Sequence, residues 1–396
     1  MRLSRTTPPE ADPAALEISR ELAGRIHEAI REAGGTLSFE RYMEMALYEP
    51  GLGYYRSGAR RFGPGGDFST APEFSSLFGR TLGRQCAEVL GHIGGGSVVE
   101  LGPGTGSLAA AALEEMERLG ALPERWRMLE VSAPLRQEQE AHLRRAVPHL
   151  MERVEWLDAL PADGEPAVWI ANEVLDALPV RCFRRGAGGV EELAVAALDG
   201  GGFGWASRPA DAALEGAVAR IEERLGAPLP EGYASEVCTR LPAFLAGLAE
   251  ALSHGVMFLI DYGYPRREYY HEQRRSGTLI CHYRHRAHDD PFFLPGLQDI
   301  TAWVDFTAVA DAALEAGLEV LGYTSQGGFL FGAGLADLVA KEIAAASEAE
   351  RMVVIQAVNR LTQPGDMGEH FKVLAVGRGY DGPISGFRMA DRRGSL

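Results

Sequence analysis

The sequence is poor in lysine and has no excess of positive charge. Only two of its 396 residues are lysine, so arginine carries nearly all of the positive charge, and the formal net charge is −16. Nucleic acids and anionic membranes both bind concentrated basic surfaces. The composition therefore argues against a nucleic-acid partner and against an anionic membrane surface.

Cysteine is also scarce, and the few cysteines are not arranged as a metal site or a disulfide framework. The four residues lie far apart and form no C-x-x-C pair: Cys86, Cys182, Cys238 and Cys281. This pattern favours reduced thiols. His282, His285 and His288 recur at a spacing of three, but no acid or cysteine completes a ligand set. We expect a polar, partly solvated loop there and no bound metal.

Long apolar runs are absent. No run approaches the 18 residues of a transmembrane helix, and the N-terminal stretch lacks the apolar segment of a signal peptide. We therefore expect no membrane insertion and a cytoplasmic location for this bacterial-looking chain.

Alternating strand and helix patterns follow an amphipathic helix within the first 35 residues. Short apolar runs occur at 97–101, 126–131, 153–157, 167–171 and 256–260, with further candidates near 318–323 and 371–377. Alternation of this kind predicts an α/β fold, with a mostly parallel sheet that has helices on both faces. No long crossover helix pattern comes directly before the last run, so we expect an antiparallel edge there.

The spacing of these patterns predicts five regions. The expected boundaries are an N-terminal helical segment and lid at 1–90, a first part of the core at 91–176, an inserted α+β lobe at 177–255, the remainder of the core at 256–380 with a smaller insertion at 263–300, and a tail at 381–396. The interval from 177 to 255 is far longer than one crossover needs, which is why we interpret it as an insertion.

A glycine-rich turn lies between the first predicted strand and its helix, in "SVVELGPGTGSLAAAALEEM" at 97–116. Such a turn lets the backbone approach a ligand, and the next helix offers its free N–H groups. Gly104, Gly106 and Ala109 fit the dinucleotide spacing G-x-G-x-x-A. Glu100 with Gly102, Gly104 and Gly106 instead resembles the cofactor loop of class I S-adenosylmethionine-dependent methyltransferases, in which an acid suits the cationic ligand.

Two further acids fit a nucleoside-bearing cofactor. Glu130 ends the next strand, where it can accept hydrogen bonds from both ribose hydroxyls, and either cofactor would need such an acid. Asp158 follows the third strand and could accept from an adenine amino group, although an ordinary loop acid is an equally simple interpretation. Nearly a hundred residues precede the glycine turn, and the scarcity of lysine leaves a dehydrogenase without a Tyr–Lys pair. Both observations favour the methyltransferase hypothesis.

Several polar residues are predicted at the carboxyl ends of the strands, where α/β sheets bind ligands. Asn172 and Glu173 follow the fourth strand with Asp176 one helical turn further, Asp261 follows the fifth, and Asp67 lies in the N-terminal lid. Asn172 could instead cap a helix. Carboxylates suit a guanidinium acceptor, because they orient it and accept its proton. We therefore regard these five residues as candidate catalytic residues.

These motifs, taken in order, resemble those of the MidA-like methyltransferases. The matching segments are "GGDFSTAPEFSSLFG", "VVELGPGTGSLA", "ANEVLDALPV", "LIDYGYP", "GLQDITAWVDFTA" and "FKVLAVGRG". The resemblance spans about residues 20–380. It implies a class I methyltransferase fold, S-adenosyl-L-methionine as cofactor, and symmetric ω-N dimethylation of a protein arginine. By position it assigns Gly102, Gly104 and Glu130 to the methyl donor, and Asp67, Asn172 and Glu173 to the borders of the donor and acceptor sites.

The resemblance also implies partners. Mitochondrial members of the family are arginine methyltransferases that assist the assembly of respiratory complex I, so a respiratory-complex subunit is a candidate protein substrate, and a homodimer is compatible with the sequence. Three alternatives stay open at this point. They are a methyltransferase with another acceptor, a donor-binding assembly factor without turnover, and an NAD(P)-dependent dehydrogenase.

Overall fold

The computed structural model describes residues 11–57, 70–161 and 164–396. The chain divides into two compact units, and each is built from three separate segments. The small unit comprises Met1–Phe68, Asp176–Leu241 and Arg266–Trp303, and the large unit comprises Ser69–Leu175, Pro242–Pro265 and Val304–Leu396.

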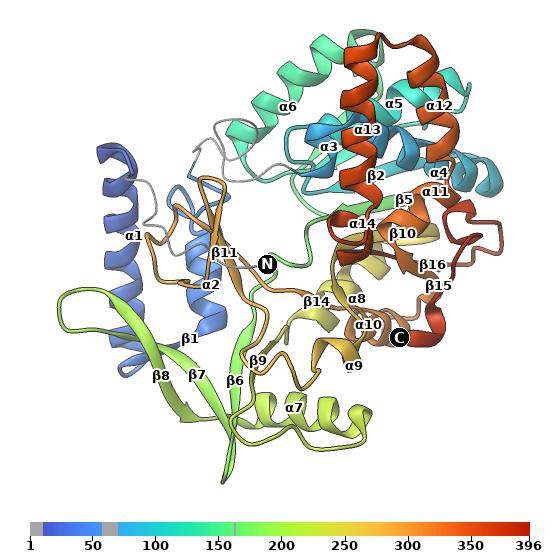
Figure 1. The fold of residues 1–396 in the computed structure, drawn as a ribbon. Coiled ribbons are helices and arrows are strands. Elements are labelled where there is room, and N and C mark those ends of the chain that lie inside the picture. The colour runs from blue at the N-terminus through green and yellow to red at the C-terminus, as the bar shows by residue number, and fades with distance from the viewer. Residues whose placement is uncertain (1–10, 58–69, 162–163) are drawn as a thin grey trace. The chain divides into compact units, whose positions relative to one another are not determined.

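An eight-stranded sheet forms the centre of the large unit (Figure 1). Its order is β15-β16-β10-β5-β2-β3-β4, and β14 pairs with β10. Strands β2, β3, β4, β5, β10 and β14 pair in parallel, whereas β16 is antiparallel to both of its neighbours. The bounds are β2 (Ser97–Leu101), β3 (Trp126–Leu129), β4 (Val154–Leu157), β5 (Glu165–Asn172), β10 (Leu252–Tyr264), β14 (Val304–Asp305), β15 (Glu319–Ser325) and β16 (Phe371–Arg378). The predicted α/β class and the antiparallel edge are confirmed.

Helices accompany this sheet on both sides. They are α3 (Ala71–Phe74), α4 (Ser76–Ile93), α5 (Ser107–Arg118), α6 (Ala133–Ala146), η1 (Pro148–Arg153), α8 (Leu241–Ala251), α10 (Phe306–Glu315), α11 (Gln326–Gly332), α12 (Leu335–Ala345), α13 (Glu348–Thr362), α14 (Met367–His370), η2 (Ser385–Phe387) and η3 (Arg393–Ser395). Residues 71–93 form two helices, α3 and α4, and not one continuous helix. Ser75 is extended (φ −154°) and its hydroxyl accepts from the Leu77 N–H, so a new helix begins there.

Burial on both faces explains the continuous apolar runs of the parallel strands. Along β10, Val256, Phe258 and Ile260 join the hydrophobic cluster that includes residues of α4 and α5. Met257 and Leu259 alternate to the opposite face and are equally buried. Figure 1 shows α4 and α5 on one side of the sheet, with α8 and α10 on the other.

Helices α4 and α5 pack unusually closely because small residues face each other. A Cβ added at Gly83 would lie 2.8 Å from the carbonyl oxygen of Ala112, and one added at Gly79 would lie 2.8 Å from the Ala111 Cβ. The alanine-rich start of α5 is therefore a requirement of this packing. The buried Glu115 carboxylate accepts from Arg80 and Arg84 on α4 at 3.0 and 2.8 Å.

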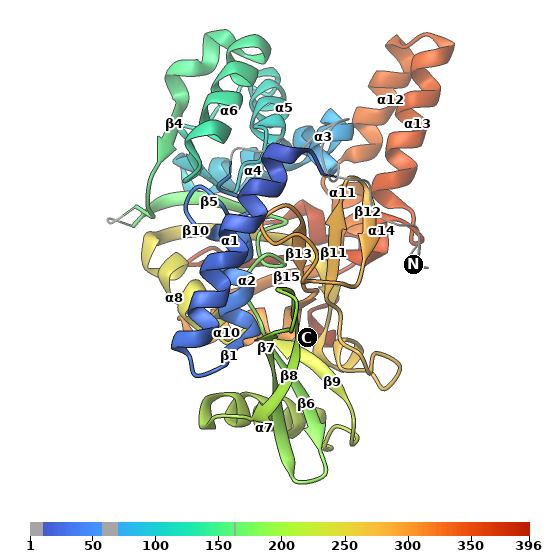
Figure 2. The ribbon, with the colours of Figure 1, turned by 90° about the vertical axis from the view of Figure 1, so that its left-hand side faces the viewer.

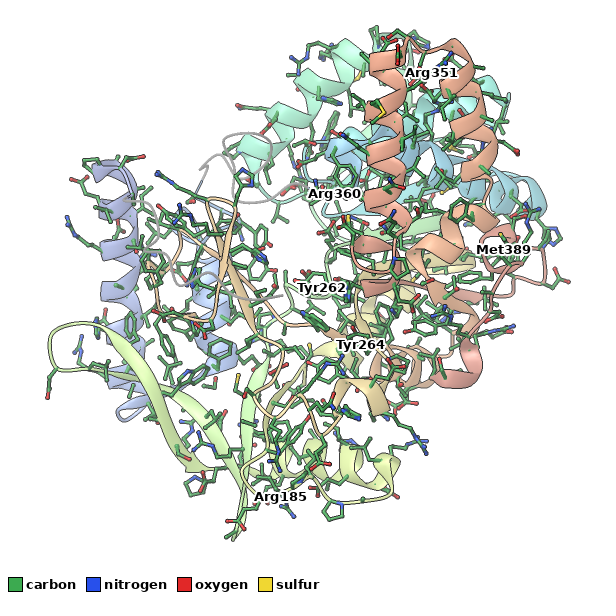
Figure 3. All side chains as sticks on the ribbon, in the orientation of Figure 1. Arg185, Tyr262, Tyr264, Arg351, Arg360 and Met389 are labelled. Carbon is green, nitrogen blue, oxygen red and sulfur yellow. The ribbon has the colours of Figure 1, made fainter. Side chains whose placement is uncertain are left out.

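The C-terminal residues belong to the large unit. Helices α12 and α13 lie side by side (Figure 2), and Arg351 and Arg360 lie toward opposite ends of α13 (Figure 3). The tail is ordered against the core, because Phe387 is buried and its ring packs on that of Phe329 at 5.3 Å.

The small unit is built around two antiparallel sheets. One has the order β1-β7-β6-β9, with β8 pairing β7, and the other has the order β12-β11-β13. Their bounds are β1 (Thr36–Ser38), β6 (Arg181–Gly186), β7 (Gly189–Ala197), β8 (Phe203–Pro209), β9 (Ala234–Val237), β11 (Ile280–Tyr283), β12 (Arg286–His288) and β13 (Asp299–Thr301). The helices are α1 (Pro13–Glu32), α2 (Phe39–Tyr48), α7 (Ala212–Leu225) and α9 (Arg266–Tyr269).

The histidine cluster lies on a β-hairpin. Tyr283 pairs with Arg286, so Arg284 and His285 form a two-residue turn, and both have positive φ, at 47° and 60°. Desolvation by burial, together with nearby His288, lowers the pKa of His282 to about 4. Among the described residues, no group of three or more His, Cys, Asp or Glu side chains is arranged to hold a metal ion.

The units divide the chain at residues that differ from the expected boundaries. Helix α4, which we placed with the N-terminal segment, packs on α5 in the large unit, as the close contact of Gly83 with Ala112 requires. The expected inserted lobe and smaller insertion both contribute to the small unit, together with the N-terminal residues. Within the described part of the chain, no helix is both long enough and apolar enough to span a bilayer.

Candidate active site

The carboxyl ends of the parallel strands β2, β3, β4, β5 and β10 meet along one edge of the large sheet. The predicted glycine turn follows β2 at this edge, and α5 begins at Ser107 directly after it. Gly102, Gly104 and Gly106 have φ values of 59°, 55° and 81°. This left-handed region disfavours every residue with a Cβ, and a Cβ on Gly102 would also lie 3.2 Å from Val174. The turn needs its glycines for backbone conformation, and Gly106, the N-cap residue of α5, has no side chain to cap the helix.

Glu130 follows β3 and is almost fully buried. Its Oε1 accepts from the Ser132 N–H at 2.7 Å, and its Oε2 accepts from Gln139 Nε2 at 3.3 Å. The same Nε2 donates to the carbonyl oxygen of Gly104 at 2.9 Å. The acid and the glycine turn are therefore joined through one side chain of α6.

The sequence did not reveal Gln139 or its partner Trp156. Gln139 is fully buried, and its Oε1 accepts from Trp156 Nε1 at 2.9 Å. It lies in "RQEQEAHL", four residues after Leu135 and four before Leu143, and both leucines are buried on the same helix. This helical spacing is the signal that could have placed Gln139 on the inward face. Arg136 was also missed. It donates to the carbonyl oxygens of Glu130 and Leu157, which joins the loops that follow β3 and β4.

Asp158 lies at the surface of the large unit. Its side chain is 92% exposed and pairs with Arg136 at 2.7 Å. The only partner that the described contacts give it is this arginine. Its assignment to an adenine amino group stays a prediction.

Glu100 differs from the expectation of a charged acid beside the glycine turn. It is buried in β2, and its Oε2 accepts from Trp126 Nε1 at 2.9 Å. Desolvation by burial raises the pKa of Glu100 to about 8, although the hydrogen bond from Trp126 acts to lower it. The side chain is therefore mostly neutral at pH 7. The contact described for it is with Trp126 of the neighbouring strand β3.

Asn172 and Glu173 form a polar corner at the end of β5. Asn172 Nδ2 donates to Glu173 Oε1 at 3.2 Å, and the Glu173 N–H donates to the carbonyl oxygen of Ile260. Among the described residues, the buried Asn172 Oδ1 has no hydrogen-bond partner. Glu173 has a φ of 55°. Positive φ at a non-glycine residue stores strain that is typical of functional sites.

Asp261 lies next to this corner and is fully buried. Its Oδ2 accepts from the Leu175 N–H and its Oδ1 from the Tyr262 N–H, at 3.0 and 2.9 Å. These contacts describe a residue that positions backbone. Tyr262 and Tyr264 continue the strand (Figure 3), and the Tyr262 ring packs edge-on against Phe371 at 5.4 Å.

Three of the five predicted catalytic residues, Asn172, Glu173 and Asp261, belong to the large unit. Asp67 lies outside the described residues. Asp176 belongs to the small unit, where its carbonyl oxygen accepts from the Ala302 N–H at 3.0 Å. The helical turn expected after Asn172 does not form, because residues 173–178 are bends and turns, so Asn172 is not a helix cap.

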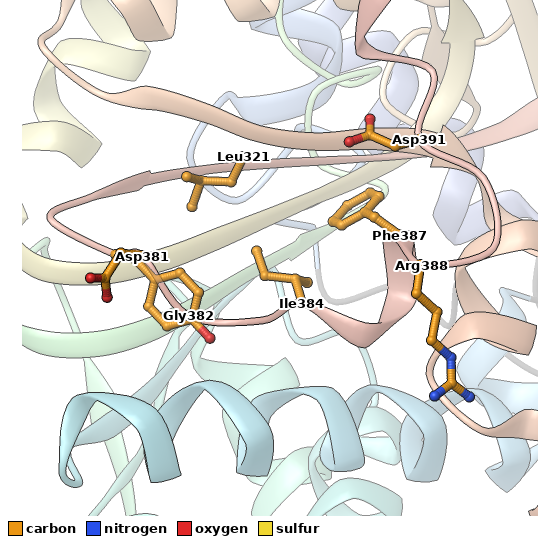
Figure 4. Close-up of a pocket in the computed structure, with 8 residues that line it drawn as sticks. Leu321, Asp381, Gly382, Ile384, Phe387, Arg388 and Asp391 are labelled. Carbon is orange, nitrogen blue, oxygen red and sulfur yellow. The ribbon is translucent and has the colours of Figure 1, made fainter.

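A separate hollow of about 320 Å³ lies between β15 and the C-terminal tail (Figure 4). It is lined by Leu321, Tyr380, Asp381, Gly382, Ile384, Phe387, Arg388 and Asp391. None of these is a predicted site residue. The glycine turn, Glu130, Asn172 and Glu173 therefore define the candidate active site.

Comparisons with known proteins bear on the choice between the two interpretations of the glycine turn. The model of a family of S-adenosyl-L-methionine-dependent methyltransferases matches residues 81–324. Curated relatives include the mitochondrial protein arginine methyltransferase NDUFAF7 of Danio rerio (29% identity, 87% of this chain and 84% of the relative) and its Drosophila melanogaster homolog (27%, 93% and 88%). A crystal structure from Burkholderia thailandensis, bound to S-adenosyl-homocysteine, is 43% identical with a TM-score of 0.92 and covers 98% of this chain and 100% of that one.

Proposed function

Because this chain belongs to the family of S-adenosyl-L-methionine-dependent methyltransferases, we propose that it transfers the methyl group of that cofactor to an arginine side chain of a protein. The resemblance to the MidA-like methyltransferases is confirmed, and the dehydrogenase interpretation of the glycine turn is set aside. Relatives named as protein arginine methyltransferases support the choice of acceptor.

The residues at the carboxyl edge of the sheet suit this cofactor. The left-handed glycines would let the backbone approach it, and the uncapped N–H groups of α5 would face it. Glu130 would accept from the ribose hydroxyls, and the Asn172 Oδ1 is a buried acceptor that still needs a donor among the described residues. The cofactor supplies a methyl group that its sulfonium has already activated.

Glu173 carries the proposal for the acceptor. A strained acid at the end of β5, held by Asn172, is placed to bind an incoming guanidinium through charge-assisted hydrogen bonds. As the new N–C bond forms, the bond between the methyl carbon and the sulfonium sulfur would break and S-adenosyl-homocysteine would leave. The guanidinium nitrogen loses a proton, which Glu173 would accept. Correct alignment of nitrogen and methyl group contributes most of the acceleration, about 7–11 kcal/mol of the barrier.

The test is transfer of a radioactive methyl group from S-adenosyl-L-methionine to arginine peptides and to proteins of a cell extract, with the products identified by mass spectrometry. We expect methylated arginine, with symmetric ω-N dimethylarginine as the final product and a respiratory-complex subunit among the acceptors. Peptides with lysine in place of arginine are the acceptor control. Methylation of another residue type would replace the arginine proposal, whereas binding of S-adenosyl-homocysteine without any transfer would favour an assembly factor.

The role of Glu173 is tested by Glu173→Gln. Loss of a positioned proton acceptor lowers rates by about 10²–10⁴-fold, while affinity for S-adenosyl-homocysteine should change little. The matched control is Glu348→Gln, because Glu348 is exposed on α13. Equal rates for the two variants would remove Glu173 from the mechanism.

A further inference from the structure

Gln139 connects the two elements to which we assign the cofactor. Its Nε2 donates to the Gly104 carbonyl oxygen, and the aliphatic part of the side chain lies beside Gly106, 3.6 Å from where a Cβ on that glycine would be. The same Nε2 reaches Glu130 Oε2 at 3.3 Å. We propose that Gln139 is a positioning residue that fixes the Glu130 carboxylate relative to the glycine turn and so forms the ribose site before the cofactor binds.

Trp156 determines which way the Gln139 amide points. An indole N–H can only donate, so the atom that faces Trp156 Nε1 at 2.9 Å must be the amide oxygen. The amide nitrogen then has to face Gly104 and Glu130, both of which offer acceptors. Every polar atom of the Gln139 side chain therefore has a partner, which its complete burial requires.

A neutral donor is well suited to this task. A guanidinium or ammonium at the same position would form an ion pair with Glu130 and compete with ribose hydroxyls for its oxygens. The nearby guanidinium of Arg136 is instead directed to the carbonyl oxygens of Glu130 and Leu157 and to Asp158. The contacts described for the Glu130 carboxylate are thus with the Gln139 amide and the Ser132 N–H.

The proposal rests on the assignment of Glu130 to the ribose and is independent of the methyl acceptor. Its experiment measures the affinity of the full chain for S-adenosyl-homocysteine by calorimetry. Adenosine and 2′,3′-dideoxyadenosine are then compared as competitors. The variants are Gln139→Met, which keeps length but removes both donors, Glu130→Gln, and the control Gln137→Met, because Gln137 is exposed on the same helix.

We expect Gln139→Met to weaken S-adenosyl-homocysteine binding by about tenfold to a hundredfold, since a hydrogen bond to a charged group is lost. The preference for adenosine over the dideoxy compound should fall with it, toward the value of Glu130→Gln, while Gln137→Met retains both. Equal weakening of the two nucleosides would indicate general damage and overturn the proposal. A preference that survives Glu130→Gln would overturn the ribose assignment itself, and the proposal with it.

A second variant keeps the proposal testable if Gln139→Met does not fold. Trp156→Phe removes the N–H that fixes the amide but leaves Gln139 in place, so the ribose preference should again decrease. In the double variant the two losses should be less than additive, because both act on the same hydrogen-bond chain. An unchanged preference in Trp156→Phe, or strictly additive losses, would contradict the proposed positioning role.

Discussion

The carboxylate of Asp261, at the end of β10, accepts a hydrogen bond from the backbone N–H of Leu175, which lies in the loop after β5. The second oxygen of Asp261 accepts from the Tyr262 N–H. One buried side chain of β10 therefore holds the loop that follows the adjacent parallel strand β5, next to Asn172 and Glu173.

Asp261→Asn should destabilise the protein and slow methyl transfer. Its amide has one oxygen, so one of the two N–H groups would face another donor, at a cost of about 1–3 kcal/mol in unfolding free energy. Asp12→Asn is the control, because Asp12 caps α1 by accepting from the Ala15 N–H, a contact that asparagine can also make. Urea denaturation checks this difference, and equal losses in both variants would contradict it.

The positive φ of Glu173 determines the order in which its glycine and alanine variants should differ in stability. Glycine adopts this conformation without strain, whereas alanine retains a penalty of about 1–2 kcal/mol. Glu173→Gly should therefore be more stable than Glu173→Ala, and both should lose methyl transfer. A thermal unfolding temperature for the alanine variant at or above that of the glycine variant would show that residue 173 is unstrained.

Burial of Glu100 predicts a loss of stability as pH rises. Its pKa is raised to about 8 in the folded protein, so the folded state keeps a proton that the unfolded chain releases above its ordinary pKa of 4.5. The stabilisation is fully present below pH 4.5 and is lost as pH rises through about 8, with a slope approaching 1.4 kcal/mol per pH unit. Unfolding free energies of the wild type and Glu100→Gln should diverge between pH 5 and 8, and parallel curves would exclude the shift.

Substitution by alanine should change the free energy of unfolding in opposite directions at Gly83 and Gly91 of α4. A Cβ at Gly83 would lie 2.8 Å from the backbone of Ala112, whereas nothing lies within 4 Å of one at Gly91. Gly83→Ala should cost about 1–3 kcal/mol through overpacking, and Gly91→Ala should add about 0.5–1 kcal/mol through helix propensity. The thermal unfolding temperatures of both variants measure this difference. Shifts of the same sign in the two variants would contradict the prediction.

Substitutions in the hairpin turn at Arg284 and His285 should be able to stabilise the folded protein. Both residues have positive φ, and two-residue turns of this kind favour Asn-Gly. Replacing the pair with Asn and Gly should raise the free energy of unfolding by about 1 kcal/mol. The same change at Arg286 and Ala287, within β12, is the control and should destabilise.

The parts of the fold that the sequence predicted are those set by continuous burial. The runs at 97–101 and 256–260 lie within β2 and β10, because strands buried on both faces are apolar throughout. The break at Ser75 and the hairpin turn depend on backbone angles that residue type does not determine. Helical spacing from Leu135 and Leu143 places Gln139 on a buried face. Its partners come from the loop after β3, from β4 and from the glycine turn at once, and no local pattern identifies those.

The segmented construction of both units affects how the nascent chain can fold. Thr36 in β1 pairs with Ala196 in β7, so β1 cannot take its place in the small sheet until β7 has been synthesised. In the large sheet, β16 lies between β10 and β15 although it follows both of them in the sequence. A chain that stops before Phe371 leaves the edges of β10 and β15 unpaired, and such edges promote aggregation. The order of synthesis thus means that the large sheet cannot be complete before β16, at Phe371–Arg378, has been made.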